Sequence, residues 1–187
     1  MTRVIIGISG ASGTVYGLRL LEELRGRQDV ETHLVVSRPG EKTLFQETGR
    51  TMNEIKGLAS HWHSIDEIGA SIASGSFLTA GMIIAPCSVH TMGAIAAGIA
   101  SNLLVRAADV TLKERRRLVL MVRESPLHLG HLRTMTALAE MGAVIAPPMP
   151  AFYTKPKTID ELVEQGVGRV LDLFGLAGDG TKRWEGM

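Results

Sequence analysis

The sequence predicts a single doubly wound α/β domain with a mainly parallel sheet and helices on both faces. Apolar runs of strand length alternate along the chain with segments of helical period. The runs are apolar throughout instead of alternating with polar residues, which is typical of parallel strands that are covered on both faces. The 187 residues, 45% of them hydrophobic, suit one domain, and no linker interrupts residues 1–187.

The first two elements are an apolar strand and an amphipathic helix. The strand is expected at residues 3–8, and a glycine-rich turn follows it. A helix is then predicted at 15–25, because Leu18, Leu21 and Leu24 recur at a spacing that places them on one face.

The next segment contains two further strands separated by polar helices. Residues 33–36 form the second predicted strand, since aliphatic side chains follow one another there. Two polar pieces, 40–48 and 52–60, are expected to be helical. The third strand is predicted at 82–85 and is expected to stop at Pro86, because proline cannot donate to a sheet ladder.

The second half of the chain continues the alternation of helix and strand. Small residues predict a helix at 91–100, and an apolar period predicts another at 103–116. The remaining elements are strands at 118–122 and 144–145 and helices at 128–141 and 158–173. Because ligands in such sheets bind beyond the carboxyl ends of the strands, the strand-to-helix turns are the places where function is expected.

Charge and cysteine content exclude several classes of protein. Twenty basic and 19 acidic residues leave a net charge of +1, which gives no electrostatic reason to expect nucleic acid or a membrane surface as partner. The single cysteine, Cys87, excludes an internal disulfide framework and a cysteine-rich zinc site. No targeting segment or apolar run of membrane-spanning length is visible, so we expect a cytoplasmic protein.

The first strand-to-helix turn reads G-x-x-G-x-x-G from Gly7 to Gly13. Glycines let a ligand approach the backbone, and the N-terminus of the next helix offers N–H groups to a phosphate. The turn therefore indicates a nucleotide or a flavin, with a tight turn and helix cap as the plainer alternative. Its spacing differs from those of the dinucleotide fingerprint and the P-loop.

The end of the second strand argues against a classical NAD site. Ser37 and Arg38 stand where an acidic residue would bind the ribose hydroxyls, and they suit a phosphate better. A reductase with a Tyr-x-x-x-Lys motif is the runner-up, at Tyr153 and Lys157. Pro156 argues against it, because proline breaks the helix that this motif needs.

The turn after the third strand offers hydroxyl and thiol groups. Ser88 and Thr91 either contact a ligand or simply cap the helix that begins there. Cys87 is a candidate nucleophile at a helix N-terminus. The alternative, a small buried residue, is favoured, since no His–Asp pair stands at a recognised spacing.

Charged residues gather at two further places. Arg106, Asp109 and Lys113 share one helix face, with Arg106 and Asp109 set among apolar residues. Arg123 and Glu124 follow the fourth predicted strand, at the edge where active sites form. The Arg123 guanidinium suits a phosphate or a flavin, and Glu124 is a candidate proton donor or acceptor. The alternative for Glu124 is a carboxylate at a helix N-terminus, which the helix dipole alone would favour.

Two histidine pairs raise the question of a metal. His61 and His63 flank Trp62, and His128 and His131 are three residues apart on a predicted helix. No carboxylate or third ligand completes a recognised spacing around either pair, so we expect no metal site.

Several motifs taken together resemble the UbiX/Pad-type flavin prenyltransferases. The resemblance runs in order over nearly the whole chain. Its motifs are residues 7–13, 74–77, 86–88, 106–110, 112–116, 122–124 and 150–153. It implies a Rossmann-like or flavodoxin-like flavoprotein domain that assembles as a homododecamer, with the tail from about residue 175 taking part in assembly or in closing the site.

The resemblance also implies an activity. Such enzymes transfer a dimethylallyl group from dimethylallyl phosphate to atoms N5 and C6 of reduced FMN, without a metal. The prenylated FMN then serves as cofactor for a partner decarboxylase of the UbiD type. A flavin-dependent cysteine decarboxylase and a non-catalytic FMN-binding subunit of a decarboxylase remain the alternatives.

Residue roles follow from the resemblance by position. FMN is expected to contact Gly10, Ala11, Ser12, Ser37, Ser88, Val89, His90, Thr91 and Arg123. Dimethylallyl phosphate is expected to contact Lys113, Arg123, Tyr153 and Arg169. Ser12, Lys113, Arg123 and Glu124 are the expected catalytic residues, with Glu124 handling protons most directly. Arg106 is expected to organise the site through Asp109.

Overall fold

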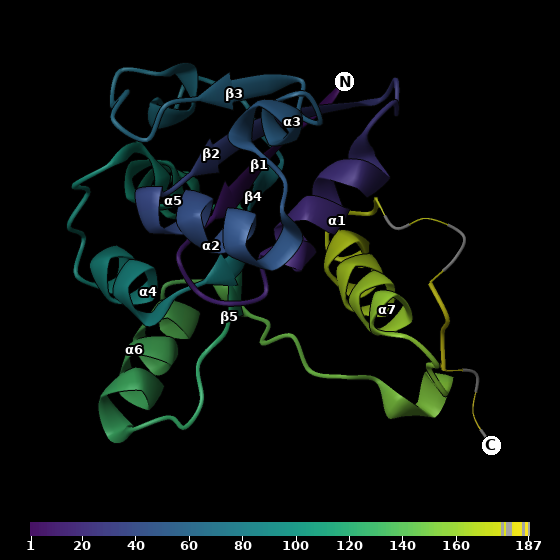
Figure 1. Ribbon diagram of the computed structural model, residues 1–187. Coiled ribbons are helices and arrows are strands. Elements are labelled where there is room, and N and C mark those ends of the chain that lie inside the picture. Colours follow the sequence, from purple (N-terminus) through teal and green to yellow (C-terminus); the bar gives the residue numbers. More distant parts are fainter. Residues whose placement is uncertain (177, 179–180, 185, 187) are drawn as a thin grey trace.

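The computed structural model describes residues 1–176, 178, 181–184 and 186. In this part of the chain six parallel strands form one sheet in the order β3-β2-β1-β4-β5-β6 (Figure 1). The strands are β1 (Thr2–Ile8), β2 (Val30–Val36), β3 (His61–His63), β4 (Gly81–Cys87), β5 (Arg117–Val122) and β6 (Val144–Ile145). The predicted single doubly wound domain is confirmed.

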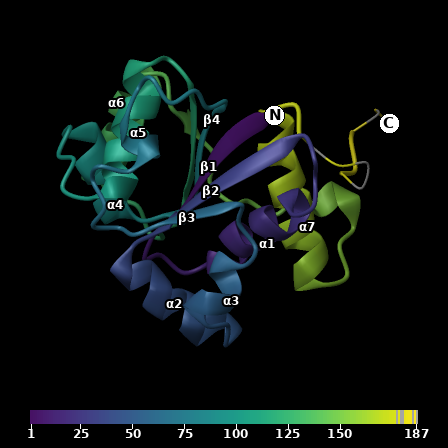
Figure 2. The same ribbon diagram turned by 90° about the horizontal axis from the view of Figure 1, so that it is seen from above.

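Helices cover both faces of this sheet. They are α1 (Thr14–Leu24), α2 (Arg38–Thr48), α3 (Met52–Lys56), α4 (Val89–Ala96), α5 (Leu103–Lys113), α6 (Leu129–Glu140) and α7 (Ile159–Asp172), with short 3-10 turns η1 (Ser71–Ala73) and η2 (Phe152–Thr154). Figure 2 shows α4, α5 and α6 on one side of the sheet and α1 and α7 on the other.

Alternate residues of each central strand supply the two cores. Val4, Ile6 and Ile8 of β1 pack with side chains of α1, α2 and α7, whereas Ile5 packs with side chains of α4, α5 and α6. All four are nearly or fully buried. Because successive side chains of a strand point to opposite faces, the uninterrupted apolar run from Val4 to Ile8 is what this two-sided packing requires.

The predicted elements are present, with helix ends displaced by up to four residues. Two expectations about strands were wrong. β4 does not stop at Pro86 but continues to Cys87, across an irregularity in its pairing with β5. β3 was missed altogether, because His61, Trp62 and His63 have no apolar run and become a strand only by pairing with β2.

Two further features of the described chain bear on earlier expectations. None of its helices is both long enough and apolar enough to cross a membrane. Part of the tail from about residue 175, which was expected to take part in assembly or site closure, lies outside the described residues.

Candidate functional site

A cavity of about 360 Å³ opens at the carboxyl ends of β1, β2 and β4. Several segments far apart in the sequence meet there. The lining residues are Gly10, Ser37, Arg38, Pro39, Ile65, Asp66, Ser88, His90, Thr91, Asn102 and Leu104. Five of the predicted cofactor-binding residues are therefore neighbours around one cavity: Gly10, Ser37, Ser88, His90 and Thr91. Its volume is within the usual range for small-molecule sites.

One wall of the cavity is the beginning of α4. The Ser88 hydroxyl caps this helix, accepting a hydrogen bond from the Thr91 backbone N–H (3.2 Å) and donating one to the Thr91 hydroxyl (3.1 Å). The Ser88 N–H in turn donates to the hydroxyl of buried Ser9 (2.7 Å). The capping alternative for Ser88 is thus realised, and the capped end also faces the cavity, where its dipole favours an anion.

The opposite wall is the beginning of α2. Ser37 caps this helix by accepting a hydrogen bond from the Gly40 N–H (3.1 Å), and Arg38 bridges to Asp66 across 2.7 Å. At Gly10 the backbone passes so close to Pro39 that a Cβ atom would lie 2.5 Å from the proline Cβ. Only glycine fits there without displacing α2, which accounts for one glycine of the first turn.

The N-terminus of α1 is occupied by a carboxylate that the sequence analysis did not identify. Glu47 of α2 accepts hydrogen bonds from the Gly13 N–H (3.0 Å), the Thr14 N–H (2.9 Å) and the Thr14 hydroxyl (2.7 Å). The expectation that these N–H groups are free for a phosphate was wrong, because α2 folds back over the turn. No spacing in the sequence signals this contact across 33 residues.

Glu47 is also coupled to the predicted catalytic residue Ser12. Burial alone would raise the pKa of Glu47, but hydrogen bonds from Ser12, Thr14 and Gly13 outweigh it and hold this pKa below its ordinary value. The ionised Glu47 therefore stabilises the fold above its ordinary pKa near 4.5, and this contribution is lost as the pH falls through the lower folded-state value.

Replacing Glu47 with glutamine should lower the free energy of unfolding at pH 7 by roughly 1 kcal/mol, the usual cost of losing a helix cap. The loss should shrink as the pH falls from 5 to 3, since protonation removes the same carboxylate charge from the wild-type protein. Urea unfolding over this pH range checks the result. Glu41→Gln on the same helix is the control, and a pH-independent difference would contradict the assignment.

Arg123 and Glu124 lie at the same edge of the sheet, directly after β5. The Arg123 N–H donates to the Cys87 carbonyl (3.1 Å), which ties this segment to the turn before α4. The Glu124 carboxylate accepts a hydrogen bond from the Ser125 N–H (2.9 Å). Both side chains are exposed and therefore accessible to a ligand at this edge.

α5 carries its charged residues to two different places. Arg106 pairs with Asp109 across 2.6 Å, as their spacing predicted. Leu104 lines the cavity, but Lys113 lies nine residues further along the helix, about 14 Å away at 1.5 Å per residue. There Lys113 forms an ion pair with Glu114. Within a single chain, Lys113 therefore does not line the cavity.

Tyr153 lies on η2 and Arg169 on α7, in a third region where the chain leaves the sheet and reaches α7 (Figure 1). The Tyr153 ring meets Trp184 edge to face, with centroids 5.5 Å apart. Arg169 pairs with Asp172, which also binds Arg183 across 2.7 Å. Neither predicted substrate residue lines the cavity of its own chain.

The reductase alternative is not supported by the local structure. Tyr153 belongs to η2, which ends at Thr154, and Lys157 precedes the N-cap of α7 at Thr158. The two side chains therefore do not share a helix, which the Tyr-x-x-x-Lys motif requires.

Cys87 is fully buried at the end of β4. Burial raises the pKa of its thiol to about 12, so the nucleophilic thiolate is scarce at neutral pH. We expect iodoacetamide at pH 8 to leave Cys87 unmodified in the native protein and to alkylate it fully in 6 M guanidinium, as read by mass spectrometry. Rapid labelling of the native protein would revive Cys87 as a candidate nucleophile.

Comparison with known proteins gives matches over nearly the whole chain. The Flavoprotein family model matches residues 1–171. The chain is 56% identical to a flavin prenyltransferase UbiX from Thauera aromatica, with 98% of this chain and 94% of the relative covered.

Two solved structures share the fold in detail. One is AnUbiX in complex with FMN and dimethylallyl pyrophosphate, with a TM-score of 0.96 and 46% identity over 100% of this chain and 98% of that one. The other is a dodecameric FMN-dependent Ubix-like decarboxylase from Escherichia coli, with a TM-score of 0.97 and 47% identity over 99% of this chain and 100% of that one.

Proposed function

This chain belongs to the UbiX flavin prenyltransferase family, and from that membership we propose that it transfers a dimethylallyl group from dimethylallyl phosphate to N5 and C6 of reduced FMN. The product is prenylated FMN, which a decarboxylase of the UbiD type uses as cofactor. The observation that carries the proposal is the cavity at the carboxyl ends of β1, β2 and β4, in a chain that matches flavin prenyltransferases over 98% of its length. A cytoplasmic location is part of the same proposal.

The residues around the cavity fit FMN. Hydroxyl groups of Ser37, Ser88 and Thr91 and the N-terminus of α4 suit a phosphate and a ribityl chain. Ile65 and Leu104 supply apolar surface for a ring system. When bound in its reduced form, the flavin supplies the electron-rich nucleophile of the reaction.

The cationic side chains are suited to the leaving phosphate. Breaking an allylic C–O bond places negative charge on the phosphate, and Lys113, Arg123 and Arg169 together with the Tyr153 hydroxyl stabilise that charge where it develops. Arg106, held by Asp109, is a positioning residue on α5. Ala11 and Val89 contribute backbone next to Gly10 and Ser88.

Proton handling falls to Glu124 and Ser12 at the carboxyl edge of the sheet. Glu124 is exposed directly after β5, within the edge that faces the cavity, and takes or returns the proton of the reacting flavin position. Ser12 is the second proton-handling residue, and Glu47, which its hydroxyl contacts, keeps it oriented.

A complete site needs more than one copy of the chain. The residues assigned to the phosphate lie at the end of α5, after β5 and on the η2–α7 arm, and only Arg123 is near the cavity of its own chain. A homododecamer, as described for the Escherichia coli structure, supports the proposal that neighbouring copies supply Lys113, Tyr153 and Arg169.

The test is anaerobic incubation of the purified protein with reduced FMN and either dimethylallyl phosphate or the diphosphate, followed by mass spectrometry of the extracted flavin. A flavin heavier by one five-carbon prenyl unit is the expected result. The two donors show which leaving group the site accepts. Tightly bound but unmodified FMN with both donors would overturn the proposal and bring the cysteine decarboxylase or the passive FMN-binding subunit forward.

A further inference from the structure

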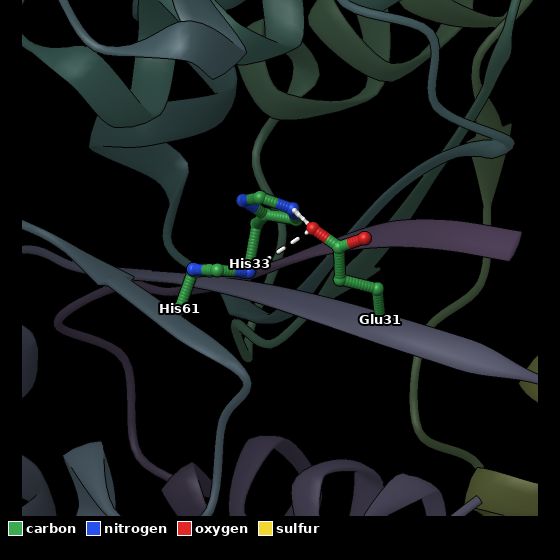
Figure 3. Close-up of side chains that lie close together, drawn as sticks. All are labelled: Glu31, His33 and His61. Carbon is green, nitrogen blue, oxygen red and sulfur yellow. Dashed lines mark hydrogen bonds and ion pairs between the residues drawn. The ribbon is translucent and has the colours of Figure 1, made fainter. Parts of the chain in front are cut away.

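Three potential metal ligands converge at the β3 edge of the sheet, away from the cavity. Figure 3 shows Glu31 and His33 of β2 and His61 of β3 pointing toward one another. Glu31 Oε1 lies 3.0 Å from His33 Nε2 and 3.1 Å from His61 Nε2, and all three candidate ligand atoms lie within 4.8 Å of one another. His33 is four residues before Ser37, about 13 Å along the strand, so this cluster is separate from the proposed flavin site.

The strand register explains why these residues meet. His33 of β2 pairs directly with His61 of β3, and Glu31 lies two residues before His33 on the same face of the sheet. The sequence predicted no metal site here, since no third ligand stands near His61 in the sequence. The other two ligands, Glu31 and His33, come from the neighbouring strand β2, some thirty residues earlier in the sequence.

Neighbouring groups hold the ligands in orientation. Arg3 Nε binds Glu31 Oε2 across 3.1 Å, which leaves Oε1 for the ion. His63 Nε2 lies 3.0 Å from His33 Nδ1, on the side of the ring opposite Glu31. With an ion on Nε2, the Nδ1–H of His33 can donate to His63, the arrangement that orients most metal-bound histidines. The Phe77 ring packs edge to face on His33, with centroids 5.1 Å apart.

We propose that Glu31 Oε1, His33 Nε2 and His61 Nε2 bind one divalent transition-metal ion of the zinc type. Tetrahedral coordination with bonds of about 2.0–2.1 Å places ligand atoms roughly 3.3 Å apart, so the separations of 3.0 and 3.1 Å between Glu31 and the two histidines need only a small expansion. The His33 and His61 rings stack with centroids 4.8 Å apart, so the exposed His61 ring has to turn to direct its Nε2 at the same ion. A set of two imidazoles and one carboxylate favours such ions over calcium or magnesium. Water fills the fourth position on the side of His61, whose side chain is 54% exposed.

The ion links the edge strand β3 to its neighbour β2. β3 has only three residues and, as the edge strand of the described sheet, pairs with β2 on one side only. A metal bridge between His33 and His61 cross-links these two strands, so the free energy of unfolding rises with the logarithm of metal concentration once that concentration exceeds Kd.

The experiment uses the full chain without a polyhistidine tag and titrates Zn²⁺ in competition with a chromophoric chelator. We expect one ion per chain, and with Co²⁺ the intense visible absorption of a tetrahedral site. His61→Gln should weaken binding by at least about 100-fold, and His63→Gln, which removes an outer partner, by about 10- to 100-fold. His131→Gln, which changes a histidine on α6, should bind as the wild type does.

Thermal unfolding, together with circular dichroism, distinguishes a variant that has lost the metal site from one that does not fold. Zn²⁺ should raise Tm in the wild type and in His131→Gln but not in His61→Gln, while circular dichroism shows the same secondary structure in all three. The proposal is overturned if the wild type does not compete with the chelator, or if His61→Gln binds Zn²⁺ as tightly as the wild type. Neither readout depends on prenyl transfer.

Discussion

Replacing Glu124 with glutamine should slow prenyl transfer by about 10²- to 10⁴-fold, the usual contribution of a general acid or base, while FMN stays bound. Glutamine keeps the size of the side chain and its hydrogen-bond acceptor, but it cannot take up or release a proton at neutral pH. Single-turnover assays under anaerobic conditions, with the extracted flavin followed by mass spectrometry, measure the rate. Quenching of flavin fluorescence measures FMN binding.

Glu23→Gln is the matched control for this prediction, because Glu23 is an exposed carboxylate on α1, outside the proposed site. Its rate should equal that of the wild type. Unchanged turnover in Glu124→Gln would remove Glu124 from proton transfer. Loss of FMN binding in that variant would instead make Glu124 part of the cofactor site.

Replacing Lys113 with alanine should lower the rate by about 10²- to 10³-fold, as expected when one donor to a developing charge is removed. FMN binding should be unchanged, since the proposed role of Lys113 is to contact the phosphate of the prenyl donor and not the flavin. Lys42→Ala, at an exposed lysine of α2, is the control and should keep the wild-type rate.

Mixed oligomers test whether Lys113 acts on the site of another copy. Lys113→Ala and Glu124→Gln chains are co-expressed with different tags, and oligomers that carry both tags are isolated. If the two residues of one site come from different copies, about one quarter of the sites in a random mixture hold both wild-type residues, and activity returns to that level. If both come from one copy, no site is complete and the mixture stays inactive.

The sequence by itself determined the architecture and the edge where the site forms. β1 and the helix after it were predictable because the strand is apolar without interruption from Val4 to Ile8 and the helix is apolar on one face. Burial on both sides of a sheet imposes the uninterrupted strand pattern. The convergence of Gly10, Ser37 and Ser88 then followed, since the carboxyl ends of parallel strands meet at one edge.

Only the tertiary structure decided the contacts between segments that are distant in the chain. Glu47 reaches the N-terminus of α1 because α2 folds back over the turn, and Lys113 is carried away from the cavity because α5 runs from that edge toward the other end of the strands. Glu31 and His33 meet His61 through a strand register, and β3 itself exists only by pairing with β2. Such contacts depend on where whole elements pack, and no local spacing of residues encodes that placement.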